Sequence, residues 1–480
     1  MMLILNRPWT LFAVSTLALL IPLATALSAE EIPPKLSLAS ATSQSGTPTA
    51  TAEEPVDTTS TESESTESDA ETQAALPAAS ESKPFNFWTS KQMTGDWGGI
   101  RTQLEDIGIT FALTYQQQYM VNMRGGLETK NGSDFGGSYD HTLELDFGKM
   151  KLIPGGSFFF RTKGTYGNEI SDFDQEKIGA LSRTNGDAGP EEPIFVDKWW
   201  YRQRLFDDRL EFRLGKIATA KDLFDVSTIA GSEDKQFLNQ ALTVNRAIAH
   251  RNGLGIYVNA WPTDWLYARA AVVDAQARPR RTGFDTAFHG PARFSVFYEL
   301  GLLPHHISSD WNLTGNYRIG SWYNPATRTI FRDTLGGALS QRTRTGDVGF
   351  YVGFDQMVWK ESSDPKDKQG LSLFGRYGYA HGDVNRVEHF WSTGTQYAGL
   401  IPTRDKDTLG FAVAQSIMSK QFRSQINARA DRETVYELYY ACHVTPWFVI
   451  SPDLQVVTNP GGDKDDRDTL VAGLRLRITF

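Results

Sequence analysis

Hydrophobic and polar residues alternate without interruption over the last twelve residues of the printed chain. From Leu470 to Phe480 every second residue is apolar, and the positions between them include Arg475 and Arg477. A repeat of two residues indicates a β-strand with one apolar and one polar face. A long strand of this kind is typical of a membrane β-barrel, which has lipid outside and water inside, and in which the last strand pairs with the first.

The same alternation recurs along the chain and predicts sixteen strands, an even number that is large enough to enclose an aqueous lumen. The predicted segments are 109–123, 139–147, 157–166, 194–205, 210–217, 254–261, 265–273, 293–302, 312–323, 350–359, 371–379, 390–400, 408–417, 434–442, 447–457 and 469–480.

The connections between these segments alternate in length. Short turns occur at 206–209, 262–264 and 443–446, whereas 167–193 and 218–253 are long. Short turns at one end and long loops at the other are typical of a barrel in an outer membrane. Two connections fit less well, because the one after segment eleven is short and the one after segment eight is long.

The polar faces of the segments predict what lines the lumen. On the predicted register both signs of charge point inward, at Glu144, Asp146, Arg161, Lys163, Arg202, Arg204, Glu211, Arg213, Arg269, Glu299, Arg318, Arg376, Glu437, Arg475 and Arg477. Such a lumen forms hydrogen bonds without a strong preference for ions of one sign. The alternative is that these charges only pair across neighbouring strands.

Two segments with other compositions precede the barrel. Arg7, an apolar run over 11–23 and the small residues Ala24-Thr25-Ala26 have the order of a secretory signal peptide, so we expect residues 1–29 to be removed after Ala26 or Ala29. Residues 30–84 are rich in Ser, Thr, Glu and Pro without a hydrophobic period, which predicts a disordered acidic segment. The barrel is expected at 85–480, and no later stretch is apolar enough for a membrane helix.

Composition and charge exclude several other functions. The formal charge of −9 matches the charge of segment 30–84 alone, so the barrel is close to neutral and has no net field to attract nucleic acid. The single Cys442 excludes an intramolecular disulfide and a cysteine-based metal cluster. No Gly-x-Ser-x-Gly, His-Glu-x-x-His or phosphate-binding motif is present, so we expect no enzyme, no cofactor and no metal site.

Several motifs in the barrel region are similar to those of a known family. The stretch MTGDWGGIRTQLEDIG begins at Met93, and later matches include Gly215-Lys216, FDV from Phe224 and RDKDTLG from Arg404. These motifs occur in the order seen in the carbohydrate-selective porins of bacterial outer membranes (OprB type), which the chain resembles over about 85–480. The motif residues are Gly95, Asp96, Trp97, Gly98, Gly99, Arg101, Arg404, Asp405 and Asp407.

The resemblance implies a sixteen-stranded porin that passes sugars by facilitated diffusion. In porins the third long connection, here 218–253, folds into the lumen as a constriction. By that likeness the candidate eyelet consists of Asp225, Glu233, Gln236, Asn239 and Arg246, facing wall residues Arg161, Lys163, Arg202 and Arg213. Aromatic faces for the apolar side of a sugar ring are expected among Trp199, Trp200, Phe224 and Phe237, although each could instead belong to the girdle that faces lipid.

Several other functions are also compatible with the sequence. The chain could be a general small-solute porin without sugar preference, or a barrel anchor whose acidic tail is a periplasmic tether. An outer-membrane enzyme and a soluble β-sandwich lectin are the remaining rivals. The expected partners are transported sugars, outer-membrane lipid and further copies of the chain in a homo-trimer, with the barrel located in the bacterial outer membrane.

Overall fold

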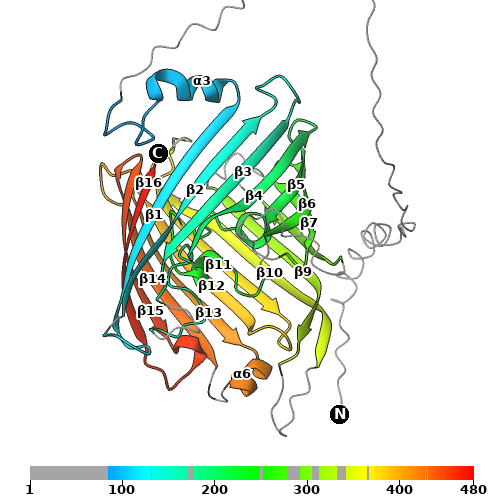
Figure 1. Ribbon diagram of the computed structural model, residues 1–480, viewed down its shortest axis with the longest axis vertical. Coiled ribbons are helices and arrows are strands. Elements are labelled where there is room, and N and C mark those ends of the chain that lie inside the picture. Colours follow the sequence, from blue (N-terminus) through cyan, green and yellow to red (C-terminus); the bar gives the residue numbers. More distant parts are fainter. Residues whose placement is uncertain are drawn as a thin grey trace, which may run out of the picture. The chain divides into compact units, whose positions relative to one another are not determined.

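A computed structural model of the chain shows a closed antiparallel β-barrel (Figure 1). It describes residues 85–130, 132–170, 177–189, 191–232, 234–248, 252–277, 292–304, 313–331, 342–364, 367–426, 429 and 431–480. The predicted signal peptide and acidic segment lie outside these residues. Each strand pairs with its neighbours in sequence, and β1 pairs with β16 to close the barrel, so no strand edge remains free.

Sixteen strands form the barrel, which confirms the number predicted from the alternation. They are β1 (Ile109–Arg124), β2 (Ser133–Asp146), β3 (Gly156–Gly167), β4 (Glu192–Leu205), β5 (Leu210–Ala218), β6 (Asn252–Thr263), β7 (Leu266–Asp274), β8 (Phe294–Leu302), β9 (Gly315–Thr329), β10 (Thr343–Lys360), β11 (Gly370–Ala380), β12 (Val387–Ala398), β13 (Thr408–Met418), β14 (Arg432–Thr445), β15 (Phe448–Thr458) and β16 (Thr469–Thr479).

Several strand boundaries were predicted wrongly, and the errors have a common cause. β2 begins at Ser133 instead of Tyr139, β10 begins at Thr343 instead of Phe350, and β9 ends at Thr329 instead of Tyr323. All three extensions lie at the end of the barrel that carries the long connections. Polar residues and glycines there interrupt the hydrophobic alternation, but main-chain pairing between strands does not require that alternation. The predicted start of the ninth strand at Asn312 lies outside the described residues.

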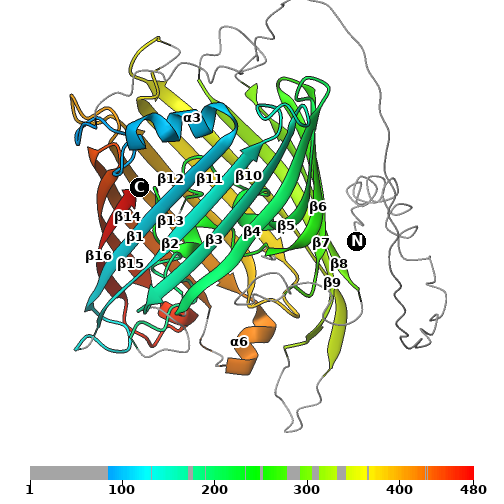
Figure 2. The same ribbon diagram turned by 45° about the horizontal axis from the view of Figure 1, so that its top comes forward.

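Short helices lie at the two ends of the barrel and inside it. The 3-10 helix η1 (Trp97–Gly99) and α3 (Ile100–Asp106) lie at the end with the short turns, and α6 (Lys420–Ile426) lies at the opposite end (Figure 2). We call these the turn end and the loop end. Helices α4 (Thr219–Asp222) and α5 (Gln240–Thr243) belong to the β5–β6 connection, and η3 (Pro460–Gly462) precedes β16. Across the described residues, no helix combines the length and the apolar character needed to span a membrane.

The distribution of apolar residues is inverted relative to that of a soluble protein. Large aliphatic side chains such as Leu214, Leu300 and Ile319 are more than half exposed on the outer surface, whereas the charged residues that precede them in the sequence point inward. Water would make this outer surface unfavourable, and lipid makes it favourable. The outward band and the inward charges therefore follow directly from the two-residue period of the strands.

Candidate functional site

A row of cationic side chains lines the lumen along β3, β4 and β5. Arg202 lies between Ser157 and Arg213 in the strand register, and its guanidinium donates to the hydroxyl of Ser157 at 3.0 Å and to Glu144 at 3.2 Å. Arg161 lies further along β3 and donates to Asp197 at 2.8 Å. We call Arg161, Lys163, Arg202 and Arg213 the cationic strip.

Each member of the strip has an acidic neighbour and still reaches the lumen. Arg213 pairs with Glu211 at 2.7 Å, and Lys163 pairs with Asp187 of the β3–β4 connection. The four side chains nevertheless remain 15–24% exposed. The strip therefore offers oriented N–H donors, and its positive charge is largely balanced by carboxylates.

An aromatic pair lies beside the cationic strip. Phe159 and Trp200 are opposite each other on β3 and β4, and their rings stack at 4.8 Å with an interplanar angle of 9°. The guanidinium of Arg213 lies 4.6 Å from the centre of the Trp200 ring. Of the aromatic residues considered from the sequence, Trp200 points inward, whereas Trp199 occupies the alternate, outer face. Phe159 was not named from the sequence, although the two-residue period places it on the same inward face as Arg161.

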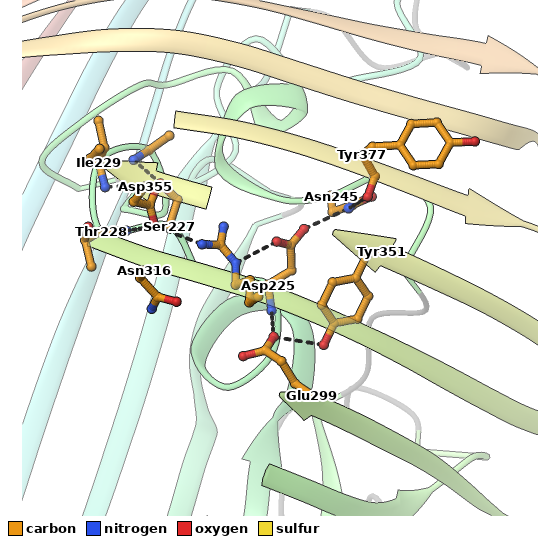
Figure 3. A network of polar contacts seen from close by, with 12 residues as sticks. Asp225, Ser227, Thr228, Ile229, Asn245, Glu299, Asn316, Tyr351, Asp355 and Tyr377 are labelled. Atoms are coloured by element: carbon orange, nitrogen blue, oxygen red, sulfur yellow. Dashed lines mark hydrogen bonds and ion pairs between the residues drawn. The ribbon is translucent and has the colours of Figure 1, made fainter. Parts of the chain in front are cut away.

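The β5–β6 connection crosses the interior of the barrel and is attached to β8, β9 and β10. Asp225 forms an ion pair with Arg318 at 2.9 Å, and Arg318 also binds Asp355 at 2.9 Å (Figure 3). The main-chain N–H of Asp225 donates to Glu299 at 2.7 Å, and the Tyr351 hydroxyl donates to the same carboxylate. All of these groups are buried.

A second attachment joins the same connection to β14 and β15. The main-chain N–H of Asn239 donates to Glu437 at 2.9 Å, and its side-chain amide donates to Gln455 at 2.9 Å. Phe237 is fully buried and contacts Tyr439 edge-to-face at 4.9 Å. Since β8–β10 and β14–β15 lie in different parts of the wall, the connection is braced at two separated places.

The predicted eyelet residues occupy different environments. Asp225 and Asn239 are buried in the two attachments, and Phe224 and Phe237 are fully buried in packing contacts, so none of the four presents a free face to the lumen. Gln236 folds back onto its own loop, accepting from Ser232 N at 3.0 Å and donating to Thr228 O at 2.6 Å. The Arg246 guanidinium donates to Leu181 O at 3.4 Å. Glu233 lies outside the described residues.

Asp234 is a loop residue that the sequence did not single out. It is close enough to Lys163, Arg475 and Arg477 to interact electrostatically with all three. This loop carboxylate therefore contributes negative charge near cations of β3 and β16. Nothing in the hydropathy pattern distinguishes Asp234 from the neighbouring acid Glu233, which explains why it was missed.

The motif from Gly95 to Arg101 closes the seam between β1 and β16 at the turn end. Arg101 donates to the Thr94 hydroxyl at 3.1 Å and to the main-chain oxygen of Phe480 at 3.3 Å, while its guanidinium lies 4.3 Å from the Trp97 ring centre. Asp96 accepts from the main chain and the hydroxyl of Thr102, each at 2.9 Å. Gly95, Gly98 and Gly99 all have positive φ, which explains why this turn uses glycine.

The Arg404–Asp407 motif fixes the turn between β12 and β13. Asp407 accepts from the Arg404 guanidinium, from the Tyr440 hydroxyl and from the main-chain N–H of His443 at 2.8 Å. Burial opposes ionisation of Asp407, but the hydrogen bonds from Arg404, Tyr440 and His443 outweigh it and lower the pKa of this carboxyl. Asp405 is exposed. This motif therefore has a structural role at the turn end, away from the cationic strip.

No cluster of three or more metal-ligating side chains occurs within the described ranges.

Comparisons with known proteins agree with this geometry. The family model described as "Carbohydrate-selective porin, OprB family" matches residues 130–480. Porin B of Pseudomonas aeruginosa is 24% identical over 422 residues, which cover 82% of this chain and 92% of that protein. The putative porin QuiX of Acinetobacter baylyi is 20% identical, over 85% of this chain and 98% of that protein. Among solved structures, the high-pH structure of Pseudomonas putida OprB superposes with a TM-score of 0.73 at 23% identity, covering 82% of this chain and all of that one.

Proposed function

Because the chain belongs to the carbohydrate-selective porin family of the OprB type, we propose that sugars pass through its barrel along the cationic strip. The protein is an outer-membrane carbohydrate porin, and its solutes are mono- and small oligosaccharides that cross by facilitated diffusion. In outer-membrane barrels the short turns face the periplasm and the long loops face the outside of the cell. The turn end of this barrel therefore faces the periplasm, and its loop end faces outward.

The observation that supports this pathway best is the half-buried Phe159 ring, which stacks on Trp200. Trp200 is itself only 8% exposed and lies beside Arg202 and Arg213. A pyranose ring has an apolar face that packs on an aromatic ring and hydroxyls that accept from planar N–H donors. The guanidinium groups supply those donors, and Glu144 and Glu211 supply acceptors nearby. A general ion channel would not need the aromatic surface.

The roles of the candidate residues follow from their surroundings. Arg161, Lys163, Arg202 and Arg213 contact the solute or its hydration water, because their side chains reach the lumen. Asp225 and Asn239 hold the crossing connection in place, because both are buried in its attachments to the wall. Gln236 and Arg246 shape the loop segments that border the pathway.

Trp200→Ala tests this assignment. Because Trp200 supports the partly exposed Phe159 ring, sugar block of the single-channel current should weaken by about two- to tenfold, the loss expected for one stacking contact of roughly 0.5–1.5 kcal/mol. Trp199→Ala is the matched control, because the neighbouring indole occupies the outer face. Equal sugar block in the parent and in Trp200→Ala would remove the support for a stacking site and favour a general small-solute porin.

The proposed roles of residues 1–84 and the proposed contacts with lipid and with further copies of the chain are tested separately. Residues 1–29 serve as a cleaved signal peptide, which the amino-terminal sequence of the mature protein would check. If residues 30–84 act as a periplasmic tether, their deletion should weaken attachment to the envelope and leave permeability unchanged. The outer apolar band contacts lipid, and chemical crosslinking in native membranes would distinguish a homo-trimer from a monomer.

A further inference from the structure

A furrow of about 780 Å³ runs across the outer face of the barrel from β7 to β12. It lies between two neighbouring rows of outward side chains, and each row follows the pairing of residues from strand to strand. The turn-side row consists of Leu302, Tyr317, Phe354, Gly375 and Thr393, and the loop-side row consists of Leu300, Ile319, Val352, Tyr377 and Trp391. The lining of the furrow is almost entirely apolar.

The tyrosines of the two rows are tied in opposite directions, which opens the furrow between them. The Tyr317 hydroxyl donates to the Gln356 amide oxygen at 2.9 Å, and Gln356 lies closer to the turn end on β10. The Tyr377 hydroxyl is hydrogen-bonded to Nδ1 of His389 at 2.8 Å, and His389 lies closer to the loop end on β12. The Tyr377 ring points away from the polar network inside the barrel (Figure 3). These two hydrogen bonds therefore hold the walls of the furrow apart.

Gly375 forms part of the floor of the furrow. It occupies an outward position without a side chain, so the Phe354 ring of the neighbouring strand extends over it, and a Cβ at this position would collide with that ring. Phe354 in turn stacks on Tyr317, with the ring centres 6.1 Å apart and an interplanar angle of 20°. The main chain of the floor is already paired between strands, so the furrow is a depression in a complete sheet.

The polar side chains of the two rows have their hydrogen bonds within the barrel. Besides the two tyrosines, Trp391 donates through Nε1 to Gln415 at 3.2 Å, and the Thr393 hydroxyl donates to Phe374 O at 2.9 Å. In lipid, apolar surfaces gain little from each other, and association of proteins there depends on close packing and hydrogen bonds. A second copy of the chain would therefore find no hydrogen-bonding side chain of these rows to bind, whereas hydrocarbon needs none.

The furrow begins at the turn end and reaches the middle of the barrel. Leu266 is the first residue of β7, and it is paired with Leu302, the last residue of β8, so this end of the furrow lies where both strands meet their short turns. Trp391 and Thr393, at the other end, lie in the middle of β12. Because the turn end faces the periplasm, the furrow starts near the head groups of the periplasmic leaflet and leads into the hydrocarbon.

We propose that the furrow binds one acyl chain of a phospholipid of the periplasmic leaflet. The head group lies near Leu266 and Leu302, and the end of the chain lies near Trp391. An unfilled furrow in the hydrocarbon would lose van der Waals contacts along both walls, and a flexible acyl chain can follow its oblique path and restore them. The inference rests on the proposed function only for the orientation of the barrel and does not require a sugar preference.

Photolabelling in phospholipid vesicles tests this proposal on the parent protein. The barrel is reconstituted in phosphatidylethanolamine and phosphatidylglycerol with a phosphatidylethanolamine that carries a diazirine at the end of one acyl chain, and the labelled residues are mapped by mass spectrometry. Val352 in the furrow should be labelled more than Val258 on β6, which is outside it, although the two outward valines are 40% and 39% exposed. Moving the diazirine next to the head group should shift the labelling from Trp391 toward Leu266 and Leu302.

A variant that fills the furrow provides the second arm of the test. Val352→Trp adds a large apolar side chain to the loop-side wall and should remove the excess labelling at Tyr377 and Trp391. Val258→Trp is the matched control, because it makes the same substitution at an equally exposed outward position, and it should leave that excess unchanged.

Equal labelling of Val352 and Val258 in the parent would overturn the proposal, and so would an unlabelled furrow that crosslinks instead to a second copy of the chain. Labelling that shifts toward the loop end when the diazirine is moved to the head group would overturn entry from the periplasmic leaflet. These parent measurements decide the question even if Val352→Trp does not fold. The labelling is done without sugar, so absence of sugar block would count against the proposed function and leave this test intact.

Discussion

Replacing Arg318 with methionine should release the crossing β5–β6 connection from the wall. The Arg318 side chain is only 1% exposed and binds two carboxylates, Asp225 on the connection and Asp355 on β10, each at 2.9 Å. Asp355 also accepts from Thr228 N at 3.2 Å, so the same cation supports a second contact to the loop. Methionine retains most of the side-chain volume and removes the charge.

The free-energy cost of losing Arg318 follows from the burial of the two acids that it binds. Asp225 and Asp355 are 1% and 4% exposed in their side chains, and removing the cation from a buried ion pair costs about 3–5 kcal/mol. If the attached loop position loses that amount, the ratio of attached to detached loop falls on the order of 10²–10⁴-fold. Single-channel recordings should then show frequent transitions to a larger conductance, which the parent lacks.

Arg376→Met is the control for this prediction. Arg376 lies on the other side of Gly353 in the same row of inward residues, and its guanidinium nitrogens make no hydrogen bond within the described part of the chain. Its removal takes away longer-range attraction to Asp225 and Asp355 and a contact with the Phe374 ring, but no hydrogen bond to the loop, so the loop should stay attached. Indistinguishable current traces from the Arg318 and Arg376 variants would refute the reasoning.

Two further predictions concern the turn end. Arg101→Ala should lower the stability of the barrel by about 1.5–3 kcal/mol, because it removes charged hydrogen bonds at the β1–β16 seam. The measurement is the temperature at which the folded barrel unfolds and its gel mobility changes, and a value equal to that of the parent would contradict the prediction. The lowered pKa of Asp407 means that its contribution to stability is complete above the ordinary carboxyl range and is lost as the pH falls through the lowered value. Asp407→Asn should therefore be less stable than the parent at neutral pH and should lose less stability on acidification, as measured by unfolding at a series of pH values.

The sequence carried most of the information about the wall of the barrel. An outward residue meets lipid and an inward residue meets water, so the alternation at Ile109–Arg124 or Thr469–Thr479 records the face of each side chain directly. The inward positions of Arg161, Arg202 and Arg213 follow from the same rule. The alternation was weakest where strands extend beyond the lipid, and there the boundaries of β2, β9 and β10 were misplaced.

The loops inside the lumen were much less predictable. Asp225 binds Arg318, which lies 93 residues away along the chain, and Asn239 binds Gln455, which lies 216 residues away. A local pattern does not record which distant strand a loop residue will meet. The family likeness identified the crossing connection but not the buried state of its side chains. The buried residues of 177–189 in the β3–β4 connection, among them Asp187, left no signal in the hydropathy pattern, because buried polar loop residues look like solvated ones.

The most direct test of the account is single-channel conductance of the refolded protein in a planar bilayer, titrated with mono- and disaccharides. We predict a stable ion current that sugar blocks in a saturable manner at sub-molar concentration, since the cationic strip and the Phe159–Trp200 pair would hold one sugar at a time. An ion current that no sugar affects would contradict a sugar-selective pathway and leave a general porin. The absence of any current would contradict the open lumen itself.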